Sequence, residues 1–157
     1  MDHFEHLVRI NDPAEPRLER LAREALWDGL WRSVAAPREH DPGVDECSLE
    51  SLGEDRARRR LRRGARLDTD LLEWRHLESI TVRPDPRGPF AGSSLDMRIE
   101  EPAPGVLFVR FTYRLVGGDT EPLTEPERLA RHAAWQQADL ARIRAVRACA
   151  LEPKVRA

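Results

Sequence analysis

The five histidines are the first residues to consider, because imidazole is both a common metal ligand and the usual general base near neutral pH. His3 and His6 stand three positions apart in an alternating segment, which places them on opposite faces of a strand. His40, His76 and His132 stand alone, without the spacing that brings two ligands onto one face of a helix. The spacing therefore predicts no metal site.

Nucleophilic and phosphate-binding motifs of the common kinds do not occur in the sequence. Cys47 alternates with Leu49 in an apolar pattern, which is typical of a small core residue, and Cys149 lies near the end of a predicted helix. Two cysteines are too few for a disulfide framework. There is no glycine-rich phosphate loop and no Gly-x-Ser-x-Gly turn. We therefore expect free thiols and no cofactor.

Polar residues placed among apolar neighbours are better candidates for a site. His76 shares a strand face with Trp74, and His6 shares one with Phe4 and Val8. Each histidine is a candidate polar anchor or general base of an enclosed site. The alternative is a hydrogen-bonded histidine in a mixed polar interior, and sequence spacing does not decide between the two.

Three further polar residues need partners if they face inward. The Tyr113 hydroxyl would have to be satisfied in a core that contains Met97 and Phe111. Gln136 and Asp139 lie on the predicted C-terminal helix, where an inward polar group needs a partner, a water or a ligand. The predicted ligand site consists of His6, Trp74, His76, Met97, Phe111, Tyr113, Gln136 and Asp139.

The one basic block is the run RRRLRR at residues 58–63. It could follow the phosphates of RNA or an anionic membrane, or it could be a solvated strand face whose charge protects a sheet edge. No aromatic residues interleave with it for base stacking, and the net charge of the chain is -2. We favour the solvated face and expect no nucleic-acid partner.

The elements that would position these residues follow from hydrophobic periodicity. Alternation predicts strands, and a 3.6-residue repeat predicts helices. The pattern gives a strand at 3–11, a helix at 18–35, strands at 44–52, 57–66, 68–78, 79–83, 92–101 and 105–116, and a long helix at 125–151, with a frayed tail at 152–157. About seven antiparallel strands form a curved sheet that the long helix must close, and such an arrangement often leaves an apolar cavity.

Length and composition are consistent with one soluble domain. The 157 residues, of which 40% are hydrophobic, suffice for one core. No apolar run approaches the roughly 20 residues of a membrane span, and the first residues do not resemble a signal peptide. We therefore expect a single domain over 1–157 in the cytoplasm, as a monomer or a homodimer.

Several short stretches occur in the order found in a known family. They are FEHL at 4–7, INDP at 10–13, REALWDGL at 23–30, MRIEEP at 97–102, LFVRFTY at 107–113 and QAD at 137–139. The chain resembles the AtaL-like family of the START-like (SRPBCC, birch-pollen-allergen-like) superfamily. Ala22 departs from the family pattern of Thr or Ser before the first helix, and losing such a cap costs about 1 kcal/mol.

The resemblance implies an α+β helix-grip fold with an interior cavity, and it brings no established catalytic residues. The first hypothesis is therefore a binding protein for a small apolar or amphipathic molecule. The alternatives are an enzyme of the cyclase, dehydratase or isomerase type that uses the same cavity, or a protein-interaction module. The module would present Trp27 or Trp31 on its surface.

Overall fold

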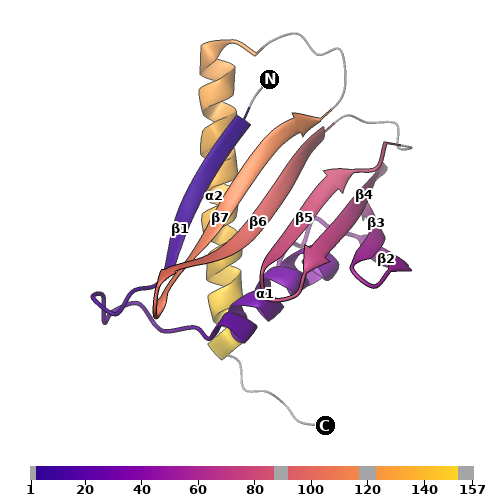
Figure 1. Ribbon diagram of the computed structural model, residues 1–157. Coiled ribbons are helices and arrows are strands. Elements are labelled where there is room, and N and C mark those ends of the chain that lie inside the picture. The colour runs from indigo at the N-terminus through magenta and orange to yellow at the C-terminus, as the bar shows by residue number, and fades with distance from the viewer. Residues whose placement is uncertain (1–2, 87–91, 117–122, 152–157) are drawn as a thin grey trace.

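The computed structural model describes residues 3–86, 92–116 and 123–151 (Figure 1). The predicted order of strand, helix, six strands and long helix is confirmed. The elements are β1 (His3–Asn11), α1 (Arg23–Ala35), the 3₁₀ turn η1 (Pro37–Glu39), β2 (Glu46–Gly53), β3 (Arg56–Arg63), β4 (Arg66–Arg75), β5 (Ser79–Pro84), β6 (Gly92–Ala103), β7 (Val106–Val116) and α2 (Glu125–Leu151).

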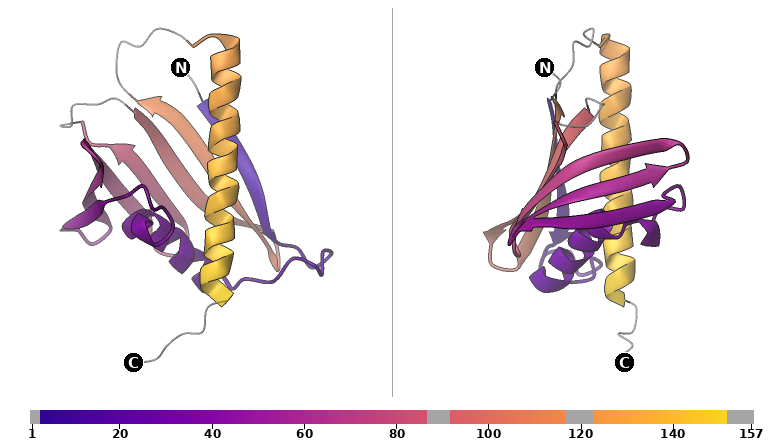
Figure 2. Two further views of the ribbon diagram at one scale, coloured as in Figure 1. Left: turned by 180° about the vertical axis from the view of Figure 1, so that it is seen from behind. Right: turned by 90° about the vertical axis from the view of Figure 1, so that its right-hand side faces the viewer.

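The seven strands form one antiparallel sheet in the order β1-β7-β6-β5-β4-β3-β2. Strands β2 to β7 follow each other as a meander, while β1 joins at the far side of β7, and β1 and β2 are the two edges. Figure 2 shows that the sheet is curved, that α2 crosses its concave side, and that α1 lies beside the lower half of α2. This is the predicted helix-grip arrangement.

The concave face carries the apolar side chains that the alternation predicts. Cross-strand partners on one face include Tyr113 with Leu95 and Phe111 with Met97. All four side chains are buried, Phe111 and Met97 completely. The opposite, convex face is polar; Arg110 there forms ion pairs with Glu5 and Glu100. One buried and one solvated face are what a sheet covered on one side requires.

Helix α1 begins at Arg23, five residues later than the sequence pattern predicts. The Asn11 side chain accepts a hydrogen bond from the Leu21 N–H and donates one to the Leu21 carbonyl, at 2.9 and 2.5 Å. These two bonds hold Leu21 outside the helix, since a side chain that satisfies the backbone competes with helical hydrogen bonds. Ala22 precedes the helix without a capping side chain, as the sequence suggests.

The two helices approach each other closely at one glycine. A Cβ atom built on Gly29 would lie 2.5 Å from Cγ1 of Val146, which shows that α2 packs against the bare backbone of α1. Both residues are buried.

Trp27 is also buried, at 7% exposure, and Trp31 packs on Trp74 with ring centroids 4.6 Å apart. The proposed surface patch around Trp27 is therefore wrong, because that side chain belongs to the core.

The first turns of α2 extend past the ends of the strands, and the first half of the helix has little cover (Figures 1 and 2). Residues 125–138 are exposed except for Arg131, His132 and Trp135, which are half-buried, and Leu129 is 58% exposed.

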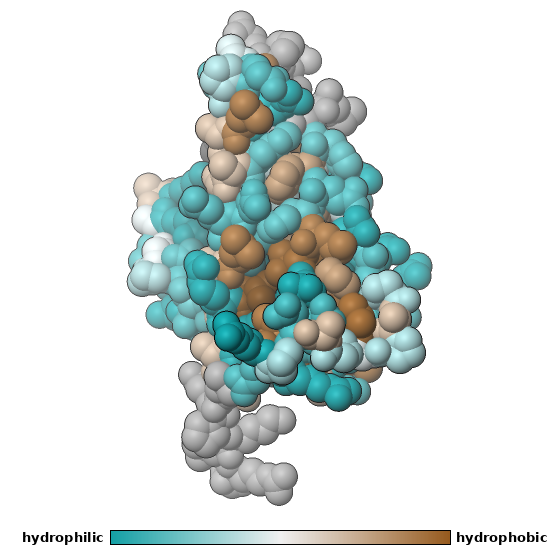
Figure 3. Space-filling view, turned by 90° about the vertical axis from the view of Figure 1, so that its left-hand side faces the viewer, coloured by the Kyte–Doolittle hydropathy of each residue, from teal (hydrophilic) through white to brown (hydrophobic). Residues whose placement is uncertain are grey.

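The face in Figure 3 is mostly hydrophilic, with a hydrophobic patch in its lower half and smaller hydrophobic spots above. In the described part of the chain, no helix combines the length and apolar character needed to cross a bilayer.

Candidate functional site

The centre of the candidate site is Asp139, a carboxyl group with no exposed surface on the inner side of α2. One of its oxygens accepts a hydrogen bond from the Tyr113 hydroxyl of β7. The other lies 3.2 Å from Nδ1 of His6 on the edge strand β1. The structure thus brings together three of the predicted site residues from three elements, with His6 and Asp139 being 133 positions apart.

Aromatic rings surround this polar network. The Trp135 ring stacks on the Tyr113 ring at 4.6 Å with an interplanar angle of 8°. Phe4 stacks on His132 at 4.7 Å, and the ring of His6 lies 6.1 Å from Phe4. Stacked rings fix the direction of the Tyr113 hydroxyl and provide flat apolar walls next to it. Trp135 and His132 face the sheet because they lie one and two turns before Asp139 on α2.

Burial is the main cause of the pKa shifts of Asp139 and Tyr113. Burial raises the pKa of Asp139, against the lowering effect of hydrogen bonds from Tyr113 and His6 and of the Arg142 charge. Burial and the neighbouring Asp139 also raise the pKa of Tyr113 far above its ordinary value. Tyr113 therefore keeps its proton at any physiological pH and acts as a hydrogen-bond donor.

The raised pKa of Asp139 has a testable consequence for the stability of the protein. Because the folded chain binds the Asp139 proton more tightly than the unfolded chain, wild-type stability falls as the pH rises from about 3.9 through the folded-state pKa. Asparagine cannot ionise, so Asp139→Asn should gain stability relative to wild type over the same range. Urea unfolding at a series of pH values measures this difference. The exposed Asp28→Asn is the control, and a difference that is independent of pH would contradict the expectation.

Arg142 is a partly buried cation on α2 close to this network. Its Nη1 atom donates to the Ser33 hydroxyl of α1 at 2.8 Å. Among the described residues, its Nε–H has no hydrogen-bond partner although the atom is buried. Burial lowers the pKa of Arg142, while the charge interactions with Tyr113 and Asp139 raise it. The site therefore contains a positive charge with an unused donor.

Arg59 brings a second guanidinium to the concave side. It lies on β3 between Ala57 and Leu61, two buried residues of the same face. It donates to the Val34 carbonyl at the end of α1 at 2.8 Å and pairs with Asp70 at 2.7 Å. The interpretation of the basic block as a solvated edge is wrong here, because β3 has β2 and β4 on either side and Arg59 faces inward.

Sequence reasoning missed both arginines, although a signal for each is present. Arg59 alternates with the apolar Ala57 and Leu61. In a strand this pattern places Arg59 on their face and its two neighbours in the sequence on the opposite face. Arg142 follows Asp139 by three residues and so lies on the same side of the helix. The large number of arginines in the chain hid these positional cues.

The other predicted site residues lie apart from the polar network. Met97 and Phe111 are completely buried in the core, and Trp74 packs on Trp31. His76 is exposed, because β4 ends at Arg75 and residues 76–78 form a turn in which Leu77 has a φ of 64°. Its ring contacts the edge of Trp27 at 5.5 Å. Gln136 is exposed on the flank of α2. The predicted inward positions of His76 and Gln136 are therefore wrong.

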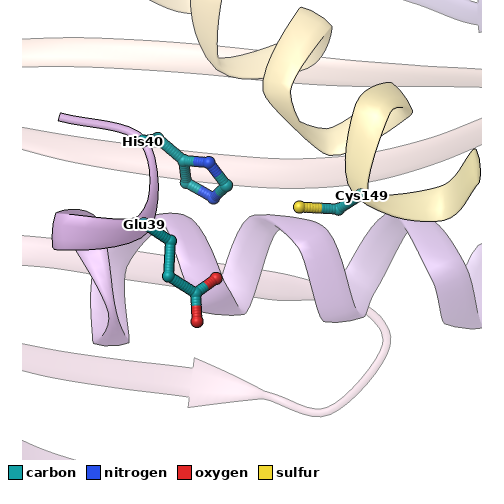
Figure 4. Close-up of side chains that lie close together, drawn as sticks. All are labelled: Glu39, His40 and Cys149. Carbon is teal, nitrogen blue, oxygen red and sulfur yellow. The ribbon is translucent and has the colours of Figure 1, made fainter. Parts of the chain in front are cut away.

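Two further features lie away from the network. A hollow of about 520 Å³ opens at the start of α1, and none of the predicted site residues lines it. Its walls are Asn11, Arg20, Leu21, Ala22, Arg23, Glu24, Glu101, Gly105 and Leu107. Near the other end of α1, Glu39, His40 and Cys149 place potential metal-ligand atoms within 4.8 Å of one another (Figure 4). No spacing pattern in the sequence indicates this group, because its members come from two distant segments.

Comparison with solved structures finds the same fold at low sequence identity. The Zhui aromatase/cyclase from Streptomyces sp. R1128 matches over 92% of this chain and 90% of that chain, with 17% identity and a TM-score of 0.58. The protein named Ara h 8.0201 matches over 92% of this chain and 93% of that chain, with 12% identity and a TM-score of 0.55. The di-domain aromatase/cyclase StfQ of the steffimycin pathway has 11% identity and a TM-score of 0.67. This chain covers 49% of StfQ, while 93% of this chain is matched.

Comparison with curated proteins finds no match. Residues 8–152 match the family described as acetylaranotin biosynthesis cluster protein L. This match includes every element except the first residues of β1, and so it contains Tyr113, Asp139 and Arg142 but not His6. The chain therefore belongs to the AtaL family.

Proposed function

We propose that this protein binds a small amphipathic molecule between the concave face of the sheet and α2, with an acidic or enolic oxygen of the ligand on Arg142. The unused Nε–H of Arg142 carries the proposal. A buried donor without a partner costs about 1–3 kcal/mol, more for a charged group, and a ligand oxygen would remove that cost.

The surroundings of Arg142 favour a ligand with one polar end and an apolar body. Tyr113 and Trp135 offer stacked ring faces, and the concave face beneath them is apolar. The structural neighbours support an aromatic ligand, since several of them are named as aromatase/cyclases. The proposed ligand is therefore a flat, partly unsaturated molecule with a carboxylate, phenolate or enolate group.

Two fluorescent probes that differ in charge test this proposal. 8-Anilinonaphthalene-1-sulfonate carries an anionic group, and N-phenyl-1-naphthylamine has a similar ring system without charge. We expect both to bind the wild type. Arg142→Met should weaken binding of the anionic probe by about tenfold or more, as for a lost hydrogen bond to a charged group, and should leave binding of the neutral probe unchanged.

The matched control is Arg144→Met, which removes an exposed arginine two residues further along α2. It should affect neither probe. Arg142→Lys keeps the charge without the Nε–H and should recover only part of the affinity. Equal loss of both probes in Arg142→Met, or loss of the anionic probe in Arg144→Met, would contradict the proposal. Native mass spectrometry of the gently purified protein would identify a ligand that remains bound and would report monomer or dimer.

A second candidate function is catalysis of the cyclase, dehydratase or isomerase type, and the His6–Asp139 pair favours it. If His6 donates its Nδ1–H to Asp139, its Nε2 atom is left as an acceptor, which is the arrangement of a general base oriented by a carboxylate. The side chain of His6 is 17% exposed, so a ligand in the site could reach it. Proton removal next to a carbonyl group is the first step shared by these reactions.

Exchange of the α-protons of an aromatic 1,3-diketone in D₂O, followed by NMR, measures this step. An enzyme should accelerate the exchange, and His6→Gln should abolish the acceleration without loss of probe binding. His76→Gln is the matched control, because His76 lies in an exposed turn. A carrier should show no acceleration. Failure of the wild type to bind either probe would instead favour an interaction module.

A further inference from the structure

A mixed group of donor atoms lies at the opposite end of α2 from its exposed first half. Glu39 is the last residue of η1, His40 follows it, and Cys149 lies in the last turns of α2. One potential ligand atom from each side chain lies within 4.8 Å of the other two. Figure 4 shows the His40 ring and the Cys149 sulfur directed toward each other across the gap, with Glu39 beside them.

The distances suit a metal ion after small side-chain movements. Zinc binds sulfur at about 2.3 Å and nitrogen or oxygen at about 2.0–2.2 Å, so tetrahedral ligand atoms lie about 3.5 Å apart. Bringing the three ligand atoms from 4.8 Å to this separation needs side-chain shifts of about 1 Å. Such shifts are easy here, because Glu39 is exposed and His40 and Cys149 are partly exposed.

The competing interaction of Glu39 is weak. Its carboxylate pairs with Arg32 of α1 at 2.7 Å, and the two side chains are 40% and 39% exposed. Exposed pairs of this kind contribute about 0–1 kcal/mol, much less than a metal–ligand set provides. Arg32 can turn into solvent when the carboxylate changes partner. The ion pair therefore does not prevent binding.

We propose that Glu39, His40 and Cys149 bind a divalent transition-metal ion, with zinc favoured over magnesium or calcium. Thiolate and imidazole select zinc-like ions over hard cations, which prefer oxygen ligands only. Three protein ligands leave one position of a tetrahedral site for water. The ion would connect the end of η1 to the end of α2, two segments about a hundred residues apart in the sequence.

Cobalt titration of the untagged protein tests this site, because Co²⁺ replaces Zn²⁺ in such sites and shows a thiolate charge-transfer band. We expect one equivalent of Co²⁺ to give this band, and Zn²⁺ to remove it by displacement. Cys149→Ser should abolish the band. His40→Ala and Glu39→Gln should each lower the affinity by about tenfold or more, since even indirect contacts to a metal site change affinity by that much.

Cys47→Ser is the matched control, because Cys47 is the other free cysteine of the chain and lies on β2. It should leave the band unchanged. Circular dichroism establishes that each variant is folded, and Cys149→Ala replaces Cys149→Ser if the serine variant does not fold. No band at equimolar Co²⁺, or a band that depends on Cys47 instead of Cys149, would overturn the proposal.

Discussion

Replacing Asp139 with alanine is expected to lower the free energy of unfolding by about 3–5 kcal/mol, the range found when one member of a buried charged pair is removed. The substitution leaves the Tyr113 hydroxyl without its acceptor and His6 without its carboxylate. It also removes a charge interaction that favours the charged form of Arg142. Urea or thermal unfolding at neutral pH measures the loss.

The isosteric Asp139→Asn separates charge from hydrogen bonding in this experiment. Its amide oxygen can still accept from Tyr113, so it should retain much of the stability that the alanine variant loses. The exposed Asp28→Ala on α1 is the control for a general effect of losing a carboxylate. A loss of less than about 1 kcal/mol in Asp139→Ala would mean that the network contributes no more than an exposed ion pair.

Replacing Gly29 with alanine is expected to destabilise the protein by about 1–3 kcal/mol, the usual cost of adding atoms to a packed core. The added methyl group would lie 2.5 Å from one Val146 methyl and 3.0 Å from the other. Both atoms belong to a short, stiff, buried side chain. The helices would have to separate, which weakens the packing of α1 against α2. Thermal unfolding measures the effect.

The decisive form of this experiment is a double-mutant cycle with Val146→Ala. In that background the clash is removed, and alanine at position 29 should stabilise the protein by up to about 1 kcal/mol through its higher helix propensity. The sign of the Gly29→Ala effect should therefore reverse. If it stays destabilising in both backgrounds, the close approach of Gly29 to Val146 is not the cause.

The sequence predicts the elements well where one face of a strand or helix is apolar. The inward sets on β6 and β7 and the range of α2 follow directly from period-two and 3.6-residue patterns. The start of α1 was misplaced because it depends on the Asn11 side chain, ten residues from Leu21, and no local pattern encodes that contact. His76 was misplaced because a turn with a left-handed leucine carries no glycine or asparagine signal.

The candidate site is only partly predictable for a related reason. His6, Tyr113 and Asp139 could each be selected as polar residues in apolar surroundings, but their meeting depends on the pairing of β1 with β7 and the crossing of α2. Arg142 and the Glu39–His40–Cys149 group required the three-dimensional placement of distant segments. A single sequence does not show which segments pair across long distances in the chain.

The strand order also sets when the site can assemble during synthesis. β1 is the first strand to leave the ribosome, yet its partner β7 is the last, whereas β2 to β7 can pair successively as neighbours in the chain. Contacts between distant segments form slowly, because a long loop must close before they give any stabilisation. β1 therefore stays without its partner strand until β7 has been synthesised. His6 meets Tyr113 and Asp139 only after both β7 and α2 have been synthesised.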